Sequence, residues 1–407
     1  MIRLSKILLF GLAAFLASWV VPWAYGLAEG GRDFSPFTLY SSVSGNFVWL
    51  ESSERGVARR DATGRSFTDK QFDSLLPFFY YRQLVADGRF PDSIRGIPVT
   101  PRTAQNGTFM FRSSPRQVNA DRPAIYPLLE SMSGRVDLES PSDVFRIDRH
   151  GITFIDCATN STEEEKSATF GETMRRKGFV FPARTIAGNP TVRKEYDEGF
   201  FITDSTGRLF HLKQTVGRPF VRSVELPEGI EPVHIFVTEF RGRQYFAFLV
   251  DASGGFHVLT TGDYATHRVD VPPVDPTRQG IMIVGNPFDW TLKISDPDGA
   301  EHLYAIDGTT FGRIAEMHYP TPEPTALEQA ARYLFPFRLT FTSRFDNEVR
   351  PRLSDFSPWA LILGAVLAVV YCTIRRQNPV RLAVPCLFIF LFGLYGFISL
   401  MLFAKQK

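Results

Sequence analysis

Three histidines in the central region are the residues whose placement most suggests chemistry. His211, His257 and His302 each follow an Asp-x-x-Gly segment by three or four residues. Imidazoles are frequent metal ligands and general bases, so equivalent positions around one axis could bring the rings to a metal ion. The competing interpretation is that they only pack at strand ends, which is the commoner role. We therefore treat them as weak metal-site candidates and assign no catalytic or cofactor-binding residue.

Known catalytic motifs are absent from the sequence. There is no Gly-x-Ser-x-Gly elbow, His-Glu-x-x-His helix, P-loop, Gly-x-Gly-x-x-Gly turn or haem-attaching Cys-x-x-Cys-His. Asp296-Pro-Asp298-Gly299 resembles the start of a calcium loop, but the later carboxylate of an EF-hand is missing. These absences favour a protein without enzymatic activity and without a cofactor.

The elements that would position the histidines are β-hairpins. Short aromatic and β-branched segments alternate with turns, which is typical of strands. The Asp-x-x-Gly turn occurs at Asp61–Gly64, Asp148–Gly151, Asp204–Gly207, Asp251–Gly254 and Asp296–Gly299. The last three intervals are 56, 47 and 45 residues, close to the length of a four-stranded propeller blade.

The predicted fold is therefore mainly β, with propeller-like repeats that would make four or five blades and with short helical insertions. We expect strands over Phe37–Leu50 to close the ring against a late strand over Arg338–Arg344. A β-sandwich or an irregular β domain would use the same turns and stays open as an alternative.

Two helical insertions are predicted within this domain. Thr68–Gln71 has the pattern of a capping box, Pro77 suits the first turn of a second short helix, and Gly88 suits its end. Pro324–Leu334 predicts another helix. The remaining polar stretches are Asp87–Arg122, expected to be a long surface connection, and Lys166–Lys177, expected to be a solvated loop or an exposed helix.

Three long stretches without charge predict transmembrane helices. They cover Ile7–Ala28, Phe356–Ile374 and Leu382–Ala404, and about 20 apolar residues suffice to cross a bilayer. A cleaved signal peptide competes with a retained anchor for the first stretch. The chain thus divides into an N-terminal anchor (1–28), a β-rich domain (29–355) and a helical hairpin (356–404).

Positive charge near the apolar stretches predicts their orientation. We expect Arg3 and Lys6 to share one side with the turn that carries Arg375, Arg376 and Arg381, and Lys405 and Lys407 to lie on the opposite side. Short basic segments stay in the cytoplasm. We therefore expect a bacterial inner-membrane protein whose large domain faces the periplasm or the exterior.

Composition narrows the partners further. The formal charge is +2, from 45 basic and 43 acidic residues, so no strong field favours nucleic acid. Of the three cysteines, only Cys157 lies outside the apolar stretches, which excludes a disulfide framework.

Two groups of residues suggest contact surfaces. Phe78, Phe79, Tyr80 and Tyr81 either pack a short helix or dock a membrane partner, because exposed aromatics mark interfaces. Gly364 and Ala368 form a small-xxx-small pair that permits close helix packing, within this hairpin or with another protein.

Two segments resemble a bacterial family of membrane-anchored proteins. They are Ser74–Leu84, continued by Asp87-Gly88 and Pro91-Asp92, and Phe201–Lys213. Members of this family carry a domain of unknown function, and their genes often lie beside those for ABC-type transporters. The resemblance covers nearly the whole chain and implies a permease and an ATPase as partners.

The leading expectation is a non-enzymatic accessory or scaffold subunit of an inner-membrane complex associated with an ABC transporter. A membrane-anchored sensor that binds a small ligand or an envelope polymer is the first alternative. A membrane-tethered hydrolase or metalloenzyme that uses the histidines is the second.

Overall fold

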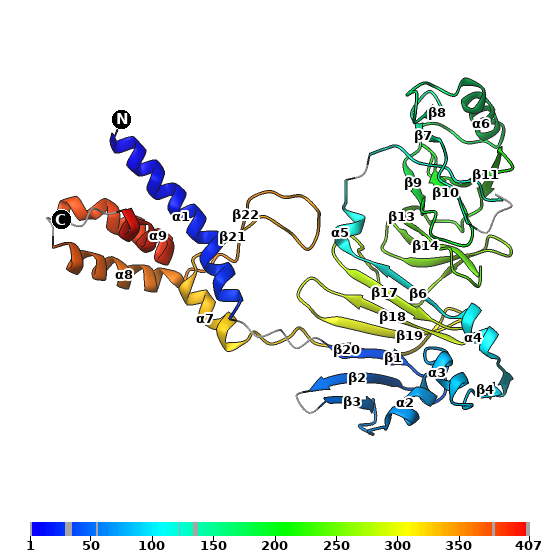
Figure 1. The fold of residues 1–407 in the computed structure, drawn as a ribbon, viewed down its shortest axis with the longest axis horizontal. Helices are drawn as coiled ribbons and strands as arrows, with labels where there is room; N and C mark the ends of the chain where they lie inside the picture. Colours follow the sequence, from blue (N-terminus) through cyan, green and yellow to red (C-terminus); the bar gives the residue numbers. More distant parts are fainter. Residues whose placement is uncertain are drawn as a thin grey trace. The chain divides into compact units, whose positions relative to one another are not determined.

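The computed structural model describes residues 2–28, 35–53, 56–121, 123–132, 137–376 and 379–403. Among the residues named above, Glu29, Arg122, Ala404, Lys405 and Lys407 lie outside them. The chain separates into two compact units (Figure 1). Unit 1 combines residues 1–34 with 321–407, and unit 2 comprises Ser35–Pro320. Nine helices and several small antiparallel sheets occur in the described residues.

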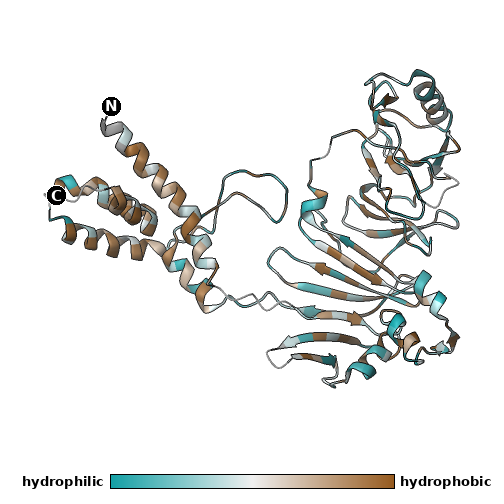
Figure 2. Cartoon of the chain, in the orientation of Figure 1, coloured by the Kyte–Doolittle hydropathy of each residue, from teal (hydrophilic) through white to brown (hydrophobic). Residues whose placement is uncertain are grey.

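Unit 1 consists of apolar helices and one small hairpin. Its elements are α1 (Ile2–Gly26), α7 (Ala326–Leu334), β21 (Arg338–Thr340), β22 (Arg352–Ser354), α8 (Ala360–Arg375) and α9 (Pro379–Phe403). Figure 2 shows α1, α8 and α9 as the most continuously apolar helices of the chain.

By length and composition alone, two of the described helices could cross a membrane, which is fewer than the three predicted. They contain Ile7–Gly26 and Val380–Phe403, of 20 and 24 residues. The middle stretch forms α8, but this helix has only 16 residues. It begins at Ala360 after a turn at Pro358 and Trp359, and before this turn the Ser357 N–H donates to the carbonyl of Pro336 at 2.9 Å.

The last apolar helix is interrupted at Gly393, where φ is 55° and ψ is −129°. A Cβ built on Gly396 would lie 3.0 Å from the carbonyl oxygen of Phe388. Residues eight apart in a continuous helix are about 12 Å apart. The two halves, residues 379–392 and 394–403, therefore fold back on each other.

The predicted helix before the last strands is confirmed as α7. Thr325 and Glu328 form a reciprocal capping box at its start, which satisfies backbone N–H groups that have no helical partner. Within unit 1, the Tyr25 hydroxyl of α1 donates to the carbonyl of Leu327 at 2.9 Å.

Unit 2 contains three successive four-stranded meanders. The first comprises β9 (Thr185–Gly188), β10 (Phe200–Thr203), β11 (Leu209–Thr215) and β12 (Arg218–Val224). The second comprises β13 (Pro232–Val237), β14 (Tyr245–Asp251), β15 (Phe256–Thr260) and β16 (Thr266–Arg268). The third comprises β17 (Gly280–Gly285), β18 (Asp289–Ser295), β19 (Glu301–Asp307) and β20 (Arg313–Tyr319), and β6 (Phe109–Ser113) adds a fifth strand beside β17.

Smaller sheets flank these meanders. They are the sheet of β1 (Phe37–Tyr40), β2 (Phe47–Ser53) and β3 (Gly56–Asp61), and the hairpins of β7 (Asp143–Ile147) with β8 (Ile152–Asp156) and of β4 (Ser93–Ile94) with β5 (Ile97–Pro98).

Apolar clusters join neighbouring sheets of unit 2 face to face. Phe145 and Phe154 of the β7–β8 hairpin pack with Phe210 of the first meander. Phe201 packs with Leu249 of the second meander. The second and third meanders share a larger cluster around Phe248 and Trp290, and Phe47 of β2 packs against Leu303.

These sheets do not close into a propeller in the part of the chain that the structure describes, so that prediction is not supported beyond the four-stranded units. The reason lies in the two sheets that flank the three meanders. The sheet of β1–β3 has three strands and the β7–β8 hairpin has two. β6 joins the third meander instead of starting another blade.

The predicted pairing between the first and the late strands is also wrong. Among the described strands, β1 pairs with β2, and β21 pairs with β22. β1 instead lies against the third meander, where the N–H of Tyr40 donates to Thr291 Oγ1 at 2.7 Å.

The helices inserted between the strands agree with the predicted positions only in part. The Thr68–Gln71 capping box is confirmed and opens α2 (Asp69–Leu75). Pro77 does not begin a helix, since α3 (Tyr81–Ala86) starts four residues later. The mixed-charge stretch forms α6 (Glu164–Arg176). The expected surface connection carries α4 (Pro101–Gly107), β6 and α5 (Pro115–Val118).

Candidate functional site

A groove of about 740 Å³ lies in unit 2 and is lined largely by strands. Its walls include consecutive residues of β6, β9 and β13, together with α5 and part of residues 120–127. Side chains alternate between the two faces of a strand. Consecutive lining residues therefore mean that the edges of these strands, not their faces, border the groove.

Each of the three strands is the outermost strand of its sheet. β9 ends the first meander, β13 ends the second, and β6 ends the five-stranded sheet. One row of backbone N–H and C=O groups on each thus has no strand partner in the described part of the chain. Such edges are templates for an additional strand.

Most side chains in the groove are apolar or neutral. Phe111, Ile125 and Val233 contribute hydrophobic surface, and Arg112 is the one Lys, Arg, Asp or Glu among the described lining residues. His234 is half-buried, which lowers its pKa although Asp275 acts in the opposite direction. The groove therefore suits a backbone-dominated, weakly charged ligand.

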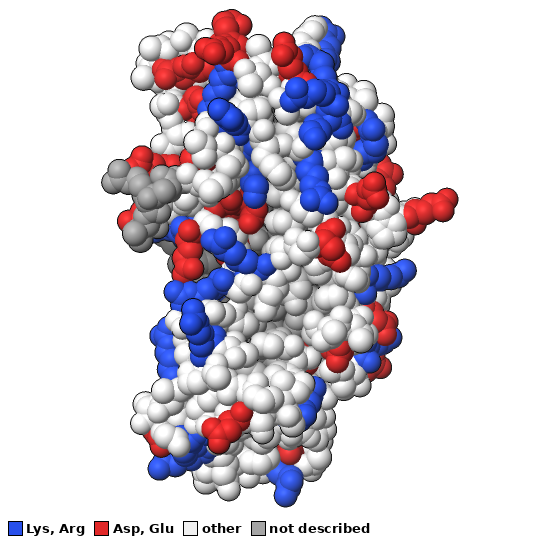
Figure 3. Space-filling view, turned by 90° about the vertical axis from the view of Figure 1, so that its right-hand side faces the viewer, with Lys and Arg blue, Asp and Glu red and all other residues white. Residues whose placement is uncertain are grey.

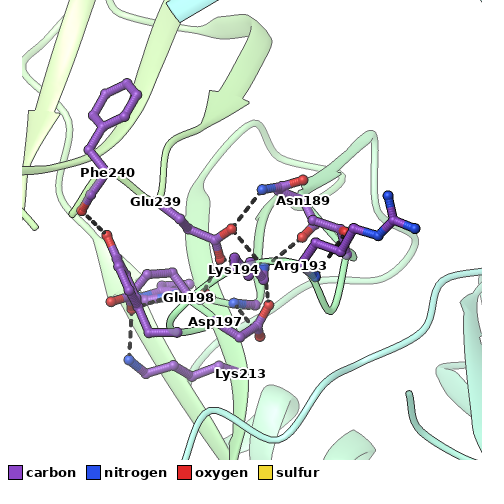
Figure 4. Close-up of polar contacts among 12 residues, drawn as sticks. Asn189, Arg193, Lys194, Asp197, Glu198, Lys213, Glu239 and Phe240 are labelled. Atoms are coloured by element: carbon purple, nitrogen blue, oxygen red, sulfur yellow. Dashed lines mark hydrogen bonds and ion pairs between the residues drawn. The ribbon is translucent and has the colours of Figure 1, made fainter. Parts of the chain in front are cut away.

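A buried ionic cluster fixes the loop between β9 and β10 at the rim of this groove (Figure 4). Lys194 Nζ donates to Asp197 Oδ1 at 2.5 Å, to Glu239 Oε1 at 2.6 Å and to the carbonyl of Asn189 at 2.6 Å. The exposed fractions of the Lys194, Asp197 and Glu239 side chains are 6%, 2% and 1%. Since Asn189 also lines the groove, the cluster holds part of the groove wall.

Two carboxylates share the single ammonium of this cluster. Burial raises the pKa of Glu239, although its contacts with Lys194 oppose the shift. Further donors compensate the carboxylates, since the Glu198 N–H donates to Glu239 Oε1 and the Gly199 N–H to Asp197 Oδ2, both at 2.8 Å. All three ammonium hydrogens have acceptors, so Lys194 has no free proton donor for chemistry.

An outer layer of contacts surrounds the cluster. The Tyr196 hydroxyl donates to the carbonyl of Phe240 at 2.7 Å, and Arg243 lies over the Tyr196 ring at 4.0 Å. Burial raises the pKa of Tyr196. Arg241 and Glu195 form an exposed ion pair at 2.9 Å. These contacts tie the β9–β10 loop to the β13–β14 loop.

The segment that contains the groove matches a known family model. Residues 37–306 match the family described as a domain of unknown function, DUF4857. This match spans more than half of the chain.

The chain belongs to the DUF4857 family.

The DUF4857 segment begins at the first residue of β1 and ends inside β19. It includes the groove strands and the ionic cluster and leaves out the apolar helices of unit 1. No curated protein matches the chain.

The three predicted histidines occupy separate sheets of the DUF4857 segment. His211 is buried on β11, where Nε2 lies 2.6 Å from the carbonyl of Glu198 and Nδ1 lies 2.8 Å from the Tyr264 hydroxyl. A carbonyl only accepts, so Nε2 carries the proton and Nδ1 accepts from Tyr264. Burial lowers the pKa of His211 to about 3, and the ring is neutral at physiological pH.

The other two histidines pair with the aspartates that begin their turns. His257 Nε2 lies 2.7 Å from Asp251 Oδ2, and His302 Nε2 lies 3.1 Å from Asp296 Oδ2. Each ring is thus engaged by its own turn. In the described residues, no three His, Cys, Asp or Glu side chains are arranged to hold a metal ion.

The Asp-x-x-Gly turns are hairpin connections with a shared contact pattern. In the turns at Asp61, Asp204 and Asp251, one carboxylate oxygen accepts from the backbone N–H groups two and four residues later at 2.7–3.0 Å. Burial alone would raise the pKa of Asp251, but hydrogen bonds from Ser253, His257 and Gly255 lower it to about 2. The turns are structural, as the Asx geometry of such residues predicts.

The aromatic group before α3 is mostly used inside unit 2. Phe78 is buried and packs against Phe288, and Tyr80 contacts Phe72. Phe79 is the exposed member, although its ring lies 5.7 Å from that of Phe37. Tyr81 is half-buried and packs against the cluster around Phe78.

The predicted small-residue pair lies on α8 inside unit 1. A Cβ on Gly364 would lie 2.5 Å from the carbonyl oxygen of Phe390, so only glycine allows this approach. Ala368 packs in the same helical cluster. In this cluster Cys372 Sγ and Cys386 Sγ are 3.0 Å apart, and Cys157 is exposed in unit 2.

A second cavity of about 570 Å³ borders the Asp251 turn. Its lining includes Ser253, Asp275 and Arg278. Charged side chains of both signs are interspersed over the face shown in Figure 3, with uncharged surface between them.

Sequence patterns did not reveal the residues that shape the groove. Arg193–Glu198 reads as a solvated charged run, yet its Lys194 and Asp197 are buried with Glu239 from a distant segment. For β6, the aromatic segment Phe109-Met110-Phe111 is the pattern that would have predicted a strand.

Proposed function

We propose that this protein is a membrane-anchored, non-enzymatic accessory or scaffold subunit of a bacterial inner-membrane complex. In this proposal the groove of unit 2 holds an extended segment of a partner polypeptide. The observation that supports it is that three sheets present their edge strands β6, β9 and β13 to one cavity.

Edge strands bind a peptide mainly through hydrogen bonds to its backbone. A peptide laid along them would satisfy N–H and C=O groups that have no strand partner, as in strand addition. The groove contributes apolar side chains and little charge, which matches an extended segment without strong sequence demands. The cluster at Lys194 keeps this wall rigid before binding, which reduces the ordering cost.

An enzymatic role receives less support from the site. Lys194 is saturated by three acceptors, and His211 is neutral and occupied on both ring nitrogens. A general base needs a free acceptor within reach of substrate.

The partner class follows from the apolar helices and from the family resemblance. The helices of unit 1 anchor the protein in the bilayer, and unit 2 lies on the extracytoplasmic side. An ABC-type permease and its ATPase are the proposed neighbours. Purification from native membranes in mild detergent should recover both.

Two variants test the groove separately from the anchor. Ile125→Lys and Val233→Lys place a charge in the groove at side chains that are 49% and 46% exposed. Each should reduce partner recovery at least about tenfold, because a charge disfavours an apolar segment in the groove. At Val233, on the edge strand β13, a lysine also disfavours strand addition. Val216→Lys, at a 70% exposed position in the β11–β12 turn, is the matched control and should leave recovery unchanged.

Equal recovery with all three variants would remove the groove from the proposal. Reproducible purification of the chain alone would remove the accessory role as a whole.

A ligand sensor is the second candidate, and the cavity beside the Asp251 turn favours it. Its volume of about 570 Å³ lies in the range of small-molecule sites. A specific ligand should raise the melting temperature, and Arg278→Ala should abolish that shift.

A further inference from the structure

The reversal at Gly393 changes what the C-terminal apolar stretch can do in a membrane. Its two halves, residues 379–392 and 394–403, are about 21 and 15 Å long at ~1.5 Å per residue. The hydrocarbon core is about 30 Å thick. Neither half crosses it alone, so the stretch does not form one transmembrane span. Residues 358–375, which are the turn at Pro358 and Trp359 together with α8, are about 27 Å long at ~1.5 Å per residue. In this inference they return the chain to the face where α1 begins.

The first half runs antiparallel to α8. Phe390 lies against Gly364 near the start of α8, and Cys386 lies against Cys372 near its end, with the sulfur atoms 3.0 Å apart. The basic turn with Arg375 and Arg381 is at that second end.

The second half returns along α1 in the opposite direction. Tyr395 packs in one cluster with Ala14 and Ala17. Further along, Ser399 Oγ donates to the carbonyl of Phe10 at 2.8 Å. The ring of Phe403 then lies 6.5 Å from the ring of Phe10. Phe403 is therefore level with the beginning of the apolar part of α1.

We infer that the C-terminal apolar stretch is a re-entrant hairpin that enters and leaves the bilayer at the face where α1 begins. The inference predicts that the chain continues from Phe403 on the cytoplasmic side. It differs from the expectation from the sequence, which puts Lys405 and Lys407 on the opposite side. The inference rests on the proposed membrane anchoring, and it names the surface that meets the anionic headgroups of the cytoplasmic leaflet.

Charge complementarity supports this assignment. In this assignment every apolar segment end that basic residues flank in the sequence faces the same side. Arg3 and Lys6 precede Phe10, Lys405 and Lys407 follow Phe403, and Arg375, Arg376 and Arg381 belong to the segment around the turn between α8 and α9. Basic residues near membrane helices remain in the cytoplasm and are attracted by anionic lipid. A straight last helix would instead leave two lysines on the far side.

Cross-linking tests the reversal itself. In a full-length chain with Cys157, Cys372 and Cys386 changed to Ala, Phe10→Cys with Phe403→Cys should be joined by a short bis-maleimide cross-linker in membranes. Phe10→Cys with Phe392→Cys is the matched control, because Phe392 lies beside the reversal, next to Phe337. Cross-linking of the control pair but not of the first would overturn the inference.

Labelling of spheroplasts tests on which side of the membrane position 405 lies. In a chain with Cys372→Ala, Cys386→Ala and Lys405→Cys, an impermeant maleimide should react with the native, exposed Cys157 and spare position 405. Position 405 should react only after permeabilisation. Reaction at 405 in intact spheroplasts would show a straight span and overturn the inference.

A Gly393→Leu variant provides the complementary case. Leucine resists the positive φ of 55° at this position, so a straightened helix should carry position 405 to the outer face. Release of the unmodified protein by alkaline washing of membranes would instead contradict the proposed membrane anchoring. This result is distinct from the labelling results, which test the hairpin alone.

Discussion

At the scale of single residues, Lys194 shows how a buried charge is tolerated. It is enclosed by two carboxylates and a carbonyl, and each partner has further donors. A buried ion pair adds little stability over an apolar pair, but removal of one partner leaves an uncompensated charge.

Lys194→Met should therefore lower the free energy of unfolding by about 3–5 kcal/mol. Urea unfolding of the full chain in detergent, followed by fluorescence, measures this. Arg241→Met removes the exposed ion pair with Glu195 and should cost no more than about 1 kcal/mol. Similar losses in the two variants would mean that the cluster does not hold the loop.

His211 gives the protein a defined sensitivity to acid. Its pKa is 6.5 ordinarily and about 3 in the folded protein. Between these values the imidazole is protonated in the unfolded chain and neutral in the folded chain. Its contribution to stability is complete above pH 6.5 and is lost as the pH falls towards 3, by up to about 1.4 kcal/mol per pH unit.

His211→Phe should flatten the loss of stability between pH 6.5 and 4, because phenylalanine keeps the ring that stacks on Phe201 and binds no proton. Melting temperatures across this range measure the slope. His150→Phe, at an exposed position, is the control and should keep the slope of the unmodified protein.

At the scale of elements, the Asp-x-x-Gly turns require glycine for two separable reasons. Gly64 and Gly254 both have φ of +82°. A Cβ at Gly64 meets open space, whereas one at Gly254 would lie 3.0 Å from Pro273 Cβ and 3.1 Å from the Val274 carbonyl oxygen.

Gly64→Ala should cost about 1–2 kcal/mol from the backbone conformation alone. Gly254→Ala adds crowding and should cost roughly 1–3 kcal/mol more. Chemical denaturation of both variants isolates the packing contribution, and equal losses would show that Val274 moves away freely.

These turns also show which parts of the fold were predictable from the sequence. The Asp carboxylate and the positive φ of the Gly are local, so the hairpins β10–β11, β14–β15 and β18–β19 were predictable from the turn residues. The capping boxes at Thr68 and Thr325 were predictable for the same reason.

Long-range pairing was not predictable in this way. Nothing in Phe109–Ser113 specifies that β6 pairs with β17, and nothing near Lys194 specifies Glu239 as its partner. The groove depends on both, so its residues were missed. The reversal at Gly393 was hidden because an apolar run looks the same whether the helix is straight or broken.

At the scale of the whole molecule, unit 2 has its own core and its two ends lie together. Ser35 donates to Glu301, and the Thr38 and Tyr319 hydroxyl oxygens are 2.8 Å apart. Adjacent ends and a separate core are typical of an independently folding domain.

A fragment of residues 35–320 should therefore be soluble and monomeric, with a β-rich circular dichroism spectrum and one cooperative melting transition. Size-exclusion chromatography and calorimetry measure this. Aggregation of the fragment, with recovery of solubility only when the apolar helices are present, would show that unit 2 needs unit 1 to fold.

The place of β1 beside the third meander has a consequence for synthesis on the ribosome. Tyr40 and Thr291, which share a hydrogen bond, are 251 residues apart in the chain. The meanders close through neighbouring strands and can form as they emerge, since local contacts assemble fastest. The sheet of β1–β3 and the strand β6 emerge first but must wait for the third meander, with open edges and uncovered aromatic rings. The nascent chain is thus most exposed to misassembly early, and translation of the third meander ends that period.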